Sequence, residues 1–263
     1  MEDDNSVESA LNSSLMNFKY VFYGKVHPER ADVNVFKPIK YTIKIPYFNI
    51  SGTMEVNILC SQITAILSMS KPIDDIGTIK CTIEGLIKQQ IDALGFCLGC
   101  GYDAEIIGVV NPLNAGETIV FGVNIPVLEA QKERRMQKLE GLVSLLSTGK
   151  GLYLQLCLSD LREAIRSTRD TGFFCYRAVE SLRQHFVIEK GIKKDGVSWE
   201  KLRCELGVER EIIDFIKEFA DPVRHGYIIE IPPSERADIL SKTWDVVDKF
   251  IEYGLNGYKQ LHE

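Results

Sequence analysis

The sequence predicts an α+β protein in which a strand-rich N-terminal half is followed by an all-helical C-terminal half. Two observations carry this prediction. Apolar and polar residues alternate over several short stretches before residue 60, whereas apolar residues recur every three to four positions after residue 128. A helical stretch at 79–95 interrupts the strands. We therefore expect a β-rich domain with one packed helix, followed by an all-α helical bundle.

The N-terminal strands are predicted from alternation and residue type. Residues 18–26 are rich in aromatic and β-branched side chains, which favour strands. In the stretch 40–47, Tyr41, Ile43 and Ile45 share one face, and Pro46 ends the run. Residues 53–59 repeat the alternation, and further strand-like runs lie at 105–110 and 118–123.

The C-terminal half shows a succession of helical stretches, which together indicate a bundle. Ser198 is a candidate N-cap for the helix that begins at Trp199. The predicted helices are 129–146, 152–167, 171–189, 198–206, 208–220 and 234–259. The predicted organisation is a disordered acidic tail at 1–14, a β-rich domain at 15–127, a helical linker at 128–151 and a helical bundle at 152–263.

Composition narrows the class of protein. The chain has 263 residues and a formal net charge of −6, which argues against broad nucleic-acid binding because phosphate neutralisation needs cations. The sequence shows neither a secretory signal nor the roughly 18 consecutive apolar residues of a membrane span. Its seven scattered cysteines suit a reducing compartment. We therefore expect a cytoplasmic protein that does not enter a membrane.

Two short motifs are weak signals. Cys97 and Cys100 form a lone C-x-x-C pair, but a zinc site needs four ligands and a redox pair normally sits at a strand-to-helix turn. Structural cysteines are the favoured interpretation, with metal or redox chemistry as the alternative. The segment Thr148–Gly151 resembles a fragment of a phosphate loop, but Ser144 and Gly151 occupy positions that the motif reserves for other residues. We therefore predict no cofactor and no metal.

The segment 211–226 carries most of the functional information. Ile212, Ile216, Phe219 and Val223 are spaced as one core-facing stripe of a helix. Pro222 disturbs this helix, so it either kinks there or stops near residue 220, with Asp221 capping a new turn. Both geometries present Arg224 and His225 at a break.

The side chains at this break suit proton transfer and charge stabilisation. Imidazole is matched to proton transfer near neutral pH, and a neighbouring arginine can stabilise charge on a phosphoryl group. The alternative is that Asp221 pairs with Arg224 or His225 and only locks the backbone. A second polar face contains Arg177, Glu180, Ser181 and Gln184. It is either a solvated surface or a group in which Arg177 or Glu180 points at the 221–225 break and orients it.

The C-terminal half resembles the HEPN superfamily, small helical bundles of prokaryotic toxins, abortive-infection proteins and several eukaryotic factors. The resemblance covers roughly residues 150–260. It rests on the bundle and on Ala220-Asp221-Pro222-Val223-Arg224-His225-Gly226, which looks like the late-helix Arg-Asn-x-x-x-His-Gly element of that group. By this resemblance His225 corresponds to the family histidine and Asp221 to the frequent asparagine. Ala220 stands where the family usually has arginine, and Arg224 is a candidate replacement for the missing cation.

The resemblance implies two functions from different classes. Many such proteins are metal-independent endoribonucleases whose Arg and His meet the same pair of a second chain, which implies a homodimer and RNA as substrate. In that case His225 is the general acid or base, Arg224 the electrostatic stabiliser, and Asp221 or Glu180 the orienting group, in a phage-defence or toxin protein. Other members are non-enzymatic dimerisation or binding modules. The β-rich domain would then recognise a protein or a small ligand.

Overall fold

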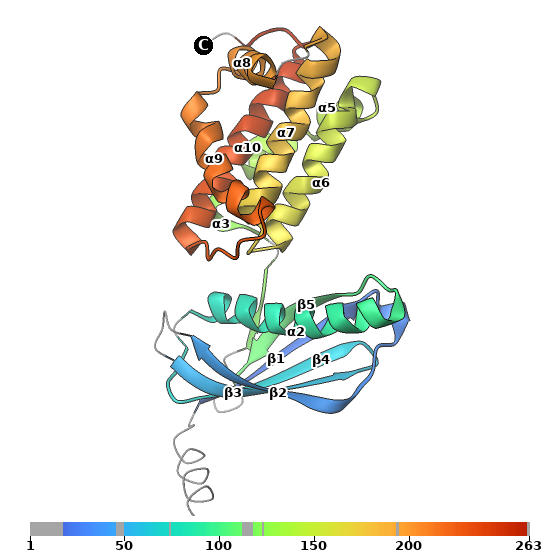
Figure 1. The fold of residues 1–263 in the computed structure, drawn as a ribbon, viewed down its shortest axis with the longest axis vertical. Coiled ribbons are helices and arrows are strands. Elements are labelled where there is room, and N and C mark those ends of the chain that lie inside the picture. The colour runs from blue at the N-terminus through green and yellow to red at the C-terminus, as the bar shows by residue number, and fades with distance from the viewer. Residues whose placement is uncertain are drawn as a thin grey trace, which may run out of the picture. The chain divides into compact units, whose positions relative to one another are not determined.

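The computed structural model divides the chain into two compact units, with the division between Val123 and Asn124 (Figure 1). Each unit has its own core of buried apolar side chains. An N-terminal antiparallel sheet followed by a helical region confirms the predicted α+β class. The structure describes residues 18–45, 50–73, 75–111, 118–122, 124–192 and 195–261. The predicted acidic tail at 1–14 lies outside them.

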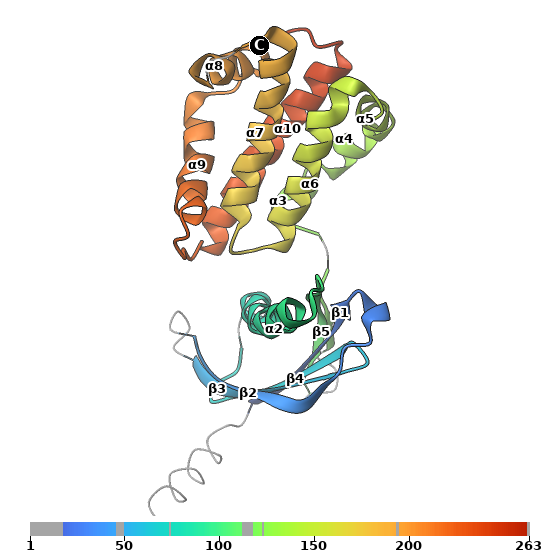
Figure 2. The same ribbon diagram turned by 45° about the vertical axis from the view of Figure 1, so that its right-hand side comes forward.

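The N-terminal unit is a six-stranded sheet with strand order β2-β3-β4-β1-β5-β6, in which every neighbouring pair is antiparallel. Helix α2 lies across one face of this sheet (Figure 2). Ile79, Ile83, Ile87 and Ile91 form its buried stripe. The elements are β1 (Phe18–His27), β2 (Val35–Ile45), β3 (Ile50–Leu59), β4 (Gln62–Met69), α2 (Ile76–Leu98), β5 (Asp103–Val110) and β6 (Thr118–Val120), with a short 3-10 turn, η1 (Glu29–Ala31).

Strand β4 is the element that the sequence patterns did not reveal. It follows β3 through a two-residue turn at Cys60 and Ser61, whose φ angles are 48° and 60°. Two-residue hairpin turns with positive φ angles usually contain Asn-Gly or Asp-Gly, which makes them recognisable in a sequence. Here tertiary hydrogen bonds hold the turn: the Cys60 N–H donates to Asn34 Oδ1 (2.8 Å) and the Ser61 N–H donates to the Val33 carbonyl (2.8 Å). These bonds stabilise the left-handed backbone in place of glycine.

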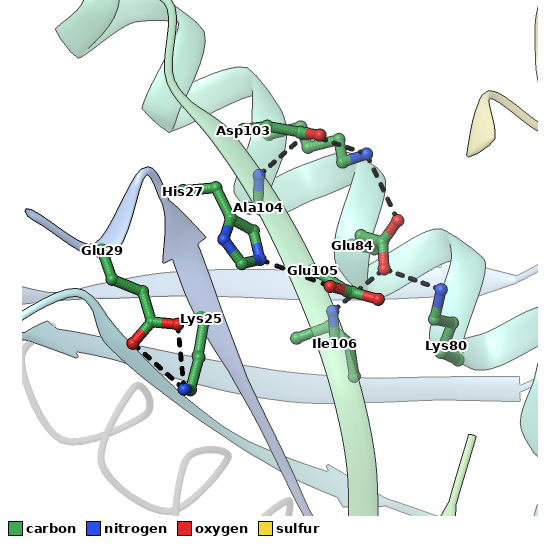
Figure 3. Close-up of polar contacts among 10 residues, drawn as sticks. Lys25, His27, Glu29, Lys80, Glu84, Asp103, Ala104, Glu105 and Ile106 are labelled. Carbon is green, nitrogen blue, oxygen red and sulfur yellow. Dashed lines mark hydrogen bonds and ion pairs between the residues drawn. The ribbon is translucent and has the colours of Figure 1, made fainter. Parts of the chain in front are cut away.

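A polar network ties α2 to β5 (Figure 3). Glu84 on α2 accepts a hydrogen bond from the Ile106 N–H (3.0 Å) and forms ion pairs with Lys80 (2.7 Å) and Lys88 (3.3 Å). Lys88 also reaches Asp103 on β5 (3.1 Å). Burial lowers the pKa of Lys88, but the carboxylates of Glu84 and Asp103 outweigh it, so the pKa is raised overall. The Ile106 N–H lies beside the register shift between β1 and β5, and Glu84 supplies its acceptor.

Replacing Glu84 should therefore loosen the helix from the sheet. Glu84→Ala leaves the Ile106 N–H without an acceptor and should cost roughly 1–3 kcal/mol of local stability. Glu84→Gln keeps an oxygen acceptor and should cost less. Hydrogen exchange at the Ile106 amide, compared with an amide in β3, measures the effect directly. Equal acceleration in both variants would show that the ion pairs, and not the hydrogen bond, hold this contact.

The C-terminal unit is a bundle in which α7 contacts α6, α8, α9 and α10. Its buried core includes Phe186 on α7 and both Phe250 and Tyr253 on α10. The elements are α3 (Pro126–Glu129), α4 (Lys132–Gln137), α5 (Leu139–Leu146), a 3-10 turn η3 (Gly149–Gly151), α6 (Leu152–Arg166), α7 (Thr171–Lys190), α8 (Asp195–Leu206), α9 (Arg210–Arg224) and α10 (Pro233–Leu255).

The helical unit differs from the sequence-based expectations at residues 128–151 and at the start of α8. The stretch 128–151, expected to be one helical linker, forms short helices, and Leu142, Leu145 and Leu146 pack against the bundle core. Ser198 was expected to cap a helix, but α8 already begins at Asp195. The buried Ser198 hydroxyl lies inside the helix and donates to the Asp195 carbonyl (2.7 Å). Serine inside a helix readily donates its hydroxyl to a backbone carbonyl one turn earlier in this way.

Gly172 sets the distance between α7 and α9. A Cβ at this position would lie 2.6 Å from the Cβ of Phe219 and 2.9 Å from its carbonyl oxygen. Real side chains do not approach so closely, so only glycine lets the two helices meet here. The contact fixes how the first turn of α7 lies against the last turns of α9.

We expect Gly172→Ala to force α7 and α9 apart and to destabilise the helical unit by about 1–3 kcal/mol. Gly196→Ala is the matched control, because a Cβ at 196 meets no heavy atom within 4 Å. That change should be neutral or stabilising. Both tryptophans, Trp199 and Trp244, lie in the helical unit, so urea unfolding followed by tryptophan fluorescence reports on that unit. Equal stability of the two variants would contradict the proposed contact.

Candidate functional site

Helix α9 continues through Pro222 and ends at Arg224, with His225 as its C-cap. Of the two predicted geometries, the one in which Asp221 caps a new turn is therefore wrong. Three backbone N–H groups close the end of the helix. The His225 N–H donates to the carbonyls of Asp221 (3.2 Å) and Pro222 (3.1 Å), the Gly226 N–H to Val223 (3.0 Å) and the Tyr227 N–H to Pro222 (3.0 Å). Gly226 has a φ of +82°, which glycine adopts readily at such a helix end. The turn that presents Arg224 and His225 is thus hydrogen-bonded in place.

The buried face of α9 is rotated relative to the prediction. Of the predicted stripe, Ile216 is fully buried, whereas Ile212, Phe219 and Val223 are half-buried. The fully buried residues are Ile213, Ile216 and Ala220. Ala220, at the position where the HEPN resemblance places an arginine, has no exposed surface. A guanidinium there would enter an apolar core, so alanine at this position has a packing reason.

Glu180 lies on α7 close to the charged groups of α9. Its carboxylate is half-buried and makes no hydrogen bond or ion pair with another described residue. Burial raises the pKa of Glu180, and Asp221 raises it further, while Arg224, Arg183 and Lys217 lower it. The pKa is raised overall. A half-buried carboxylate that keeps no direct partner is a candidate for function, because such groups are costly to retain.

Asp221 completes this charged group. Its Oδ2 lies 3.8 Å from Lys217 Nζ, and its Oδ1 lies 4.0 Å from Arg224 Nη1. Both pairs are long and partly exposed, so they contribute little to stability. Arg224 has 47% of its side chain exposed, and it remains available to a ligand. The structure therefore brings Glu180, Asp221 and Arg224 together.

His225 follows Arg224 on the surface. The residue is exposed, and its ring makes no hydrogen bond or ion pair with any residue that the structure describes. The alternative in which Asp221 locks the backbone by pairing with His225 therefore has no contact to support it. The imidazole remains open to solvent beside Arg224.

Arg177, predicted to point toward the 221–225 break, turns to the other side of α7. Its Nε donates to Asp160 Oδ1 on α6 (2.8 Å), and its guanidinium lies over the rings of Phe173 and Phe174. Asp160 is buried, so this pair satisfies a carboxylate that would otherwise lack a partner. Arg177 has a structural role and does not join the site.

The sequence reasoning missed three residues that border Glu180. Arg183 is only 8% exposed, and its Nη1 donates to Asp195 (2.8 Å) and Ser198 (3.2 Å). Its guanidinium lies over the ring of Trp199, which stacks on Tyr176. The positions 176, 180 and 183 share one face of a helix, and that spacing was the available signal. Arg183 is one of the cations that lower the pKa of Glu180, and Trp199 packs on its guanidinium.

The remaining motifs show no sign of chemistry. No disulfide bond joins any of the seven cysteines, and both Cys97 and Cys100 lie exposed around the left-handed C-cap Gly99. The Thr148 hydroxyl accepts a hydrogen bond from the Gly151 N–H (3.1 Å), so this segment caps a turn. Among the described residues no group of His, Cys, Asp and Glu side chains is arranged to hold a metal ion. No helix in the described part of the chain is long and apolar enough to cross a bilayer.

The fold and site define a two-domain α+β protein with a polar site on its helical domain. Residues 20–121 match the N-terminal domain, and residues 139–255 the C-terminal domain, of a family described as Domain of unknown function (DUF8168). The chain therefore contains both domains of this family, in the order that their names give. No curated protein and no solved structure matches the chain significantly.

The charges around Glu180 predict opposite responses to two neutralising substitutions. Arg224→Gln removes an attractive cation, so the pKa of Glu180 should rise further. Asp221→Asn removes a repulsive carboxylate, so the pKa should fall. Titration of the Glu180 carboxyl carbon by NMR in the three proteins measures both shifts. Shifts in the same direction would contradict this arrangement.

The raised pKa also fixes the sign of a pH effect on stability. Between the ordinary value of 4.5 and the raised folded value, the folded state binds the proton more tightly than the unfolded state. Stability of the wild type relative to Glu180→Gln should therefore fall as pH rises through this window and stay constant above it. Chemical unfolding of both proteins across the acid range tests this sign.

Proposed function

We propose that the helical unit is a HEPN-like module that forms a homodimer and cleaves RNA without a metal ion. The observation that carries the proposal is the exposure of Arg224 and His225 on a hydrogen-bonded turn, with Arg224 in electrostatic contact with Glu180, whose carboxylate has no hydrogen-bond or ion-pair partner among the described residues. A carboxylate that served only to stabilise the fold would normally have a hydrogen-bond or ion-pair partner. The arrangement suits a site that is completed by a ligand or a second chain.

The chemistry of RNA cleavage explains which roles these residues would take. Attack of a ribose 2′-hydroxyl on the adjacent phosphorus requires one group to accept the hydroxyl proton and another to protonate the departing 5′-oxygen. His225 is suited to either proton transfer, and Arg224 to the negative charge that develops on the phosphoryl oxygens. Asp221 and Glu180 would hold Arg224 in position. The described residues of one chain place one imidazole, that of His225, at this site, so a second copy would supply the second proton-transfer group.

The proposed function also includes a cellular compartment and a biological role. Seven cysteines without a disulfide bond fit a reducing cytoplasm, and a phage-defence or toxin role follows from the resemblance. In that setting the β-rich unit would respond to a trigger, either a protein or a small ligand, and restrain or release the nuclease.

A second candidate function is a non-enzymatic binding and dimerisation module, and the burial of Ala220 favours it. With alanine in the core, the site has one arginine fewer than the resemblance predicts. The β-rich unit would then provide the recognition of a protein or small ligand, and the polar surface of α7 and α9 would serve association alone.

An RNA cleavage assay in the presence of EDTA separates the two functions. We expect the wild type to cleave single-stranded RNA, and His225→Ala to lose roughly 100-fold or more in rate, as expected for loss of a general acid or base. Arg177→Ala is the control, because Arg177 pairs with Asp160 on α6. This variant should lower the stability of the fold but leave the cleavage rate of the folded protein nearly unchanged. Cleavage of equal rate by wild type and His225→Ala, or none by either, would support the binding module.

A further inference from the structure

An open hollow lies in the N-terminal unit where the chain leaves β1 and enters β5. Strand β1 ends at His27, β5 begins at Asp103, and these two residues are paired in the sheet. The turn after β1 and the loop before β5 therefore leave the sheet side by side. The hollow between them has a volume of about 460 Å³ and is lined by Pro28, Arg30, Ala31, Cys100, Gly101 and Tyr102. This volume lies within the roughly 300–1,000 Å³ of sites that bind small molecules.

Arg30 is the one charged side chain among the described residues that line the hollow. The other basic side chains at the end of β1 are already paired: Lys25 Nζ lies 3.0 Å from Glu29 Oε1, and His27 Nε2 lies 3.3 Å from Glu105 Oε2 (Figure 3). Arg30 is exposed and forms no hydrogen bond or ion pair with another described residue. Its guanidinium therefore keeps planar donors that match a carboxylate or a phosphate.

The rest of the lining is small or apolar. Pro28 and Ala31 contribute aliphatic surface, and Tyr102 contributes an aromatic ring. Gly101 has no side chain, and a Cβ at this position would meet no heavy atom within 4 Å, so the space in front of it is open. The Cys100 thiol donates to the Leu98 carbonyl (3.5 Å). A lining of apolar surface with one cation suits a molecule that has a compact apolar body and an anionic group.

We infer that this hollow is a binding site for a small molecule that carries a carboxylate or a phosphate on a compact apolar body. Arg30 holds the anion, and Pro28, Ala31 and Tyr102 contact the apolar body. The inference rests on the recognition role proposed for the β-rich unit, and it selects a small ligand over a protein. The reason is the shape of the site, because protein interfaces cover about 800 Å² on each partner, whereas small molecules bind in hollows of this size.

Alkylation of cysteines in the full wild-type chain tests the site. Cys100 lines the hollow, whereas Cys97 is also exposed but does not belong to the lining. The probes are phenyl phosphate and benzoate, and the controls are phenol, which lacks the anion, and inorganic phosphate, which lacks the apolar body. We expect a probe at ten times its Kd to slow the reaction of Cys100 with iodoacetamide roughly tenfold, since only the unoccupied fraction reacts. Cys97 should react at an unchanged rate, and mass spectrometry measures both.

Two substitutions remove the two halves of the site. Arg30→Gln should weaken binding of either probe roughly tenfold or more, as for loss of a charge-assisted hydrogen bond. Gly101→Leu fills the hollow and should abolish binding. The matched controls are Lys19→Gln, which removes an exposed cation at the other end of β1, and Gly85→Leu, which adds the same side chain at another open position. Both controls should bind like the wild type, as followed by NMR titration of the Tyr102 amide signal.

The outcomes separate this site from the proposed ribonuclease. Protection of Cys100 alone, together with weakened binding in Arg30→Gln but not in Lys19→Gln, supports the site, and the tighter probe identifies the anion as carboxylate or phosphate. The inference is overturned if neither probe protects Cys100, if Cys97 is protected equally, if Arg30→Gln binds like the wild type, or if phenol or inorganic phosphate binds as tightly as the probes. None of these measurements involves RNA. Their failure therefore leaves the ribonuclease standing, and a chain that cleaves no RNA can still show the site.

Discussion

The close contact between α7 and α9 is the constraint on which the candidate site depends. Gly172 lets the first turn of α7 meet Phe219, and the same pair of helices then places Glu180 within the electrostatic influence of Asp221 and Arg224. A side chain at residue 172 would change the separation that sets these interactions. The packing of these two helices thus determines which charges act on Glu180.

The charged groups of the helical unit fall into two kinds. Arg177 with Asp160, Arg183 with Asp195, and Arg135 with Asp248 form hydrogen-bonded pairs across helices. In each pair at least one side chain is largely buried: Asp160, Arg183 and Asp248. Glu180 on α7 and His225 at the end of α9 differ, because neither makes a hydrogen bond or ion pair with another described residue, and Arg224 has only a long contact of 4.0 Å with Asp221.

In the N-terminal unit, by contrast, the polar side chains of the α2–β5 network and of the β3–β4 turn are paired within the fold. Its helix α2 is held to β5 by Glu84, whose two ion pairs and one backbone hydrogen bond leave little capacity for a ligand. Its β3–β4 turn is likewise held by its own chain through Asn34 and Val33. These polar groups are therefore explained by the fold.

The sequence by itself determined the class of fold. The alternation in 53–59 and the three-to-four spacing in 79–95 report directly which side chains face a core, because the periodicity of a strand or helix is local. It also marked the segment 220–226 as the end of a helix, because Pro222 and Gly226 are unfavourable in a helix interior, although α9 continues through Pro222 to Arg224. Tertiary structure decided the rest. The Cys60–Ser61 turn depends on bonds from residues some 27 positions away, Arg177 finds Asp160 on another helix, and the burial of Ala220 follows from which face of α9 meets α7. These features arise from contacts between distant segments, and a local pattern of residues cannot specify them.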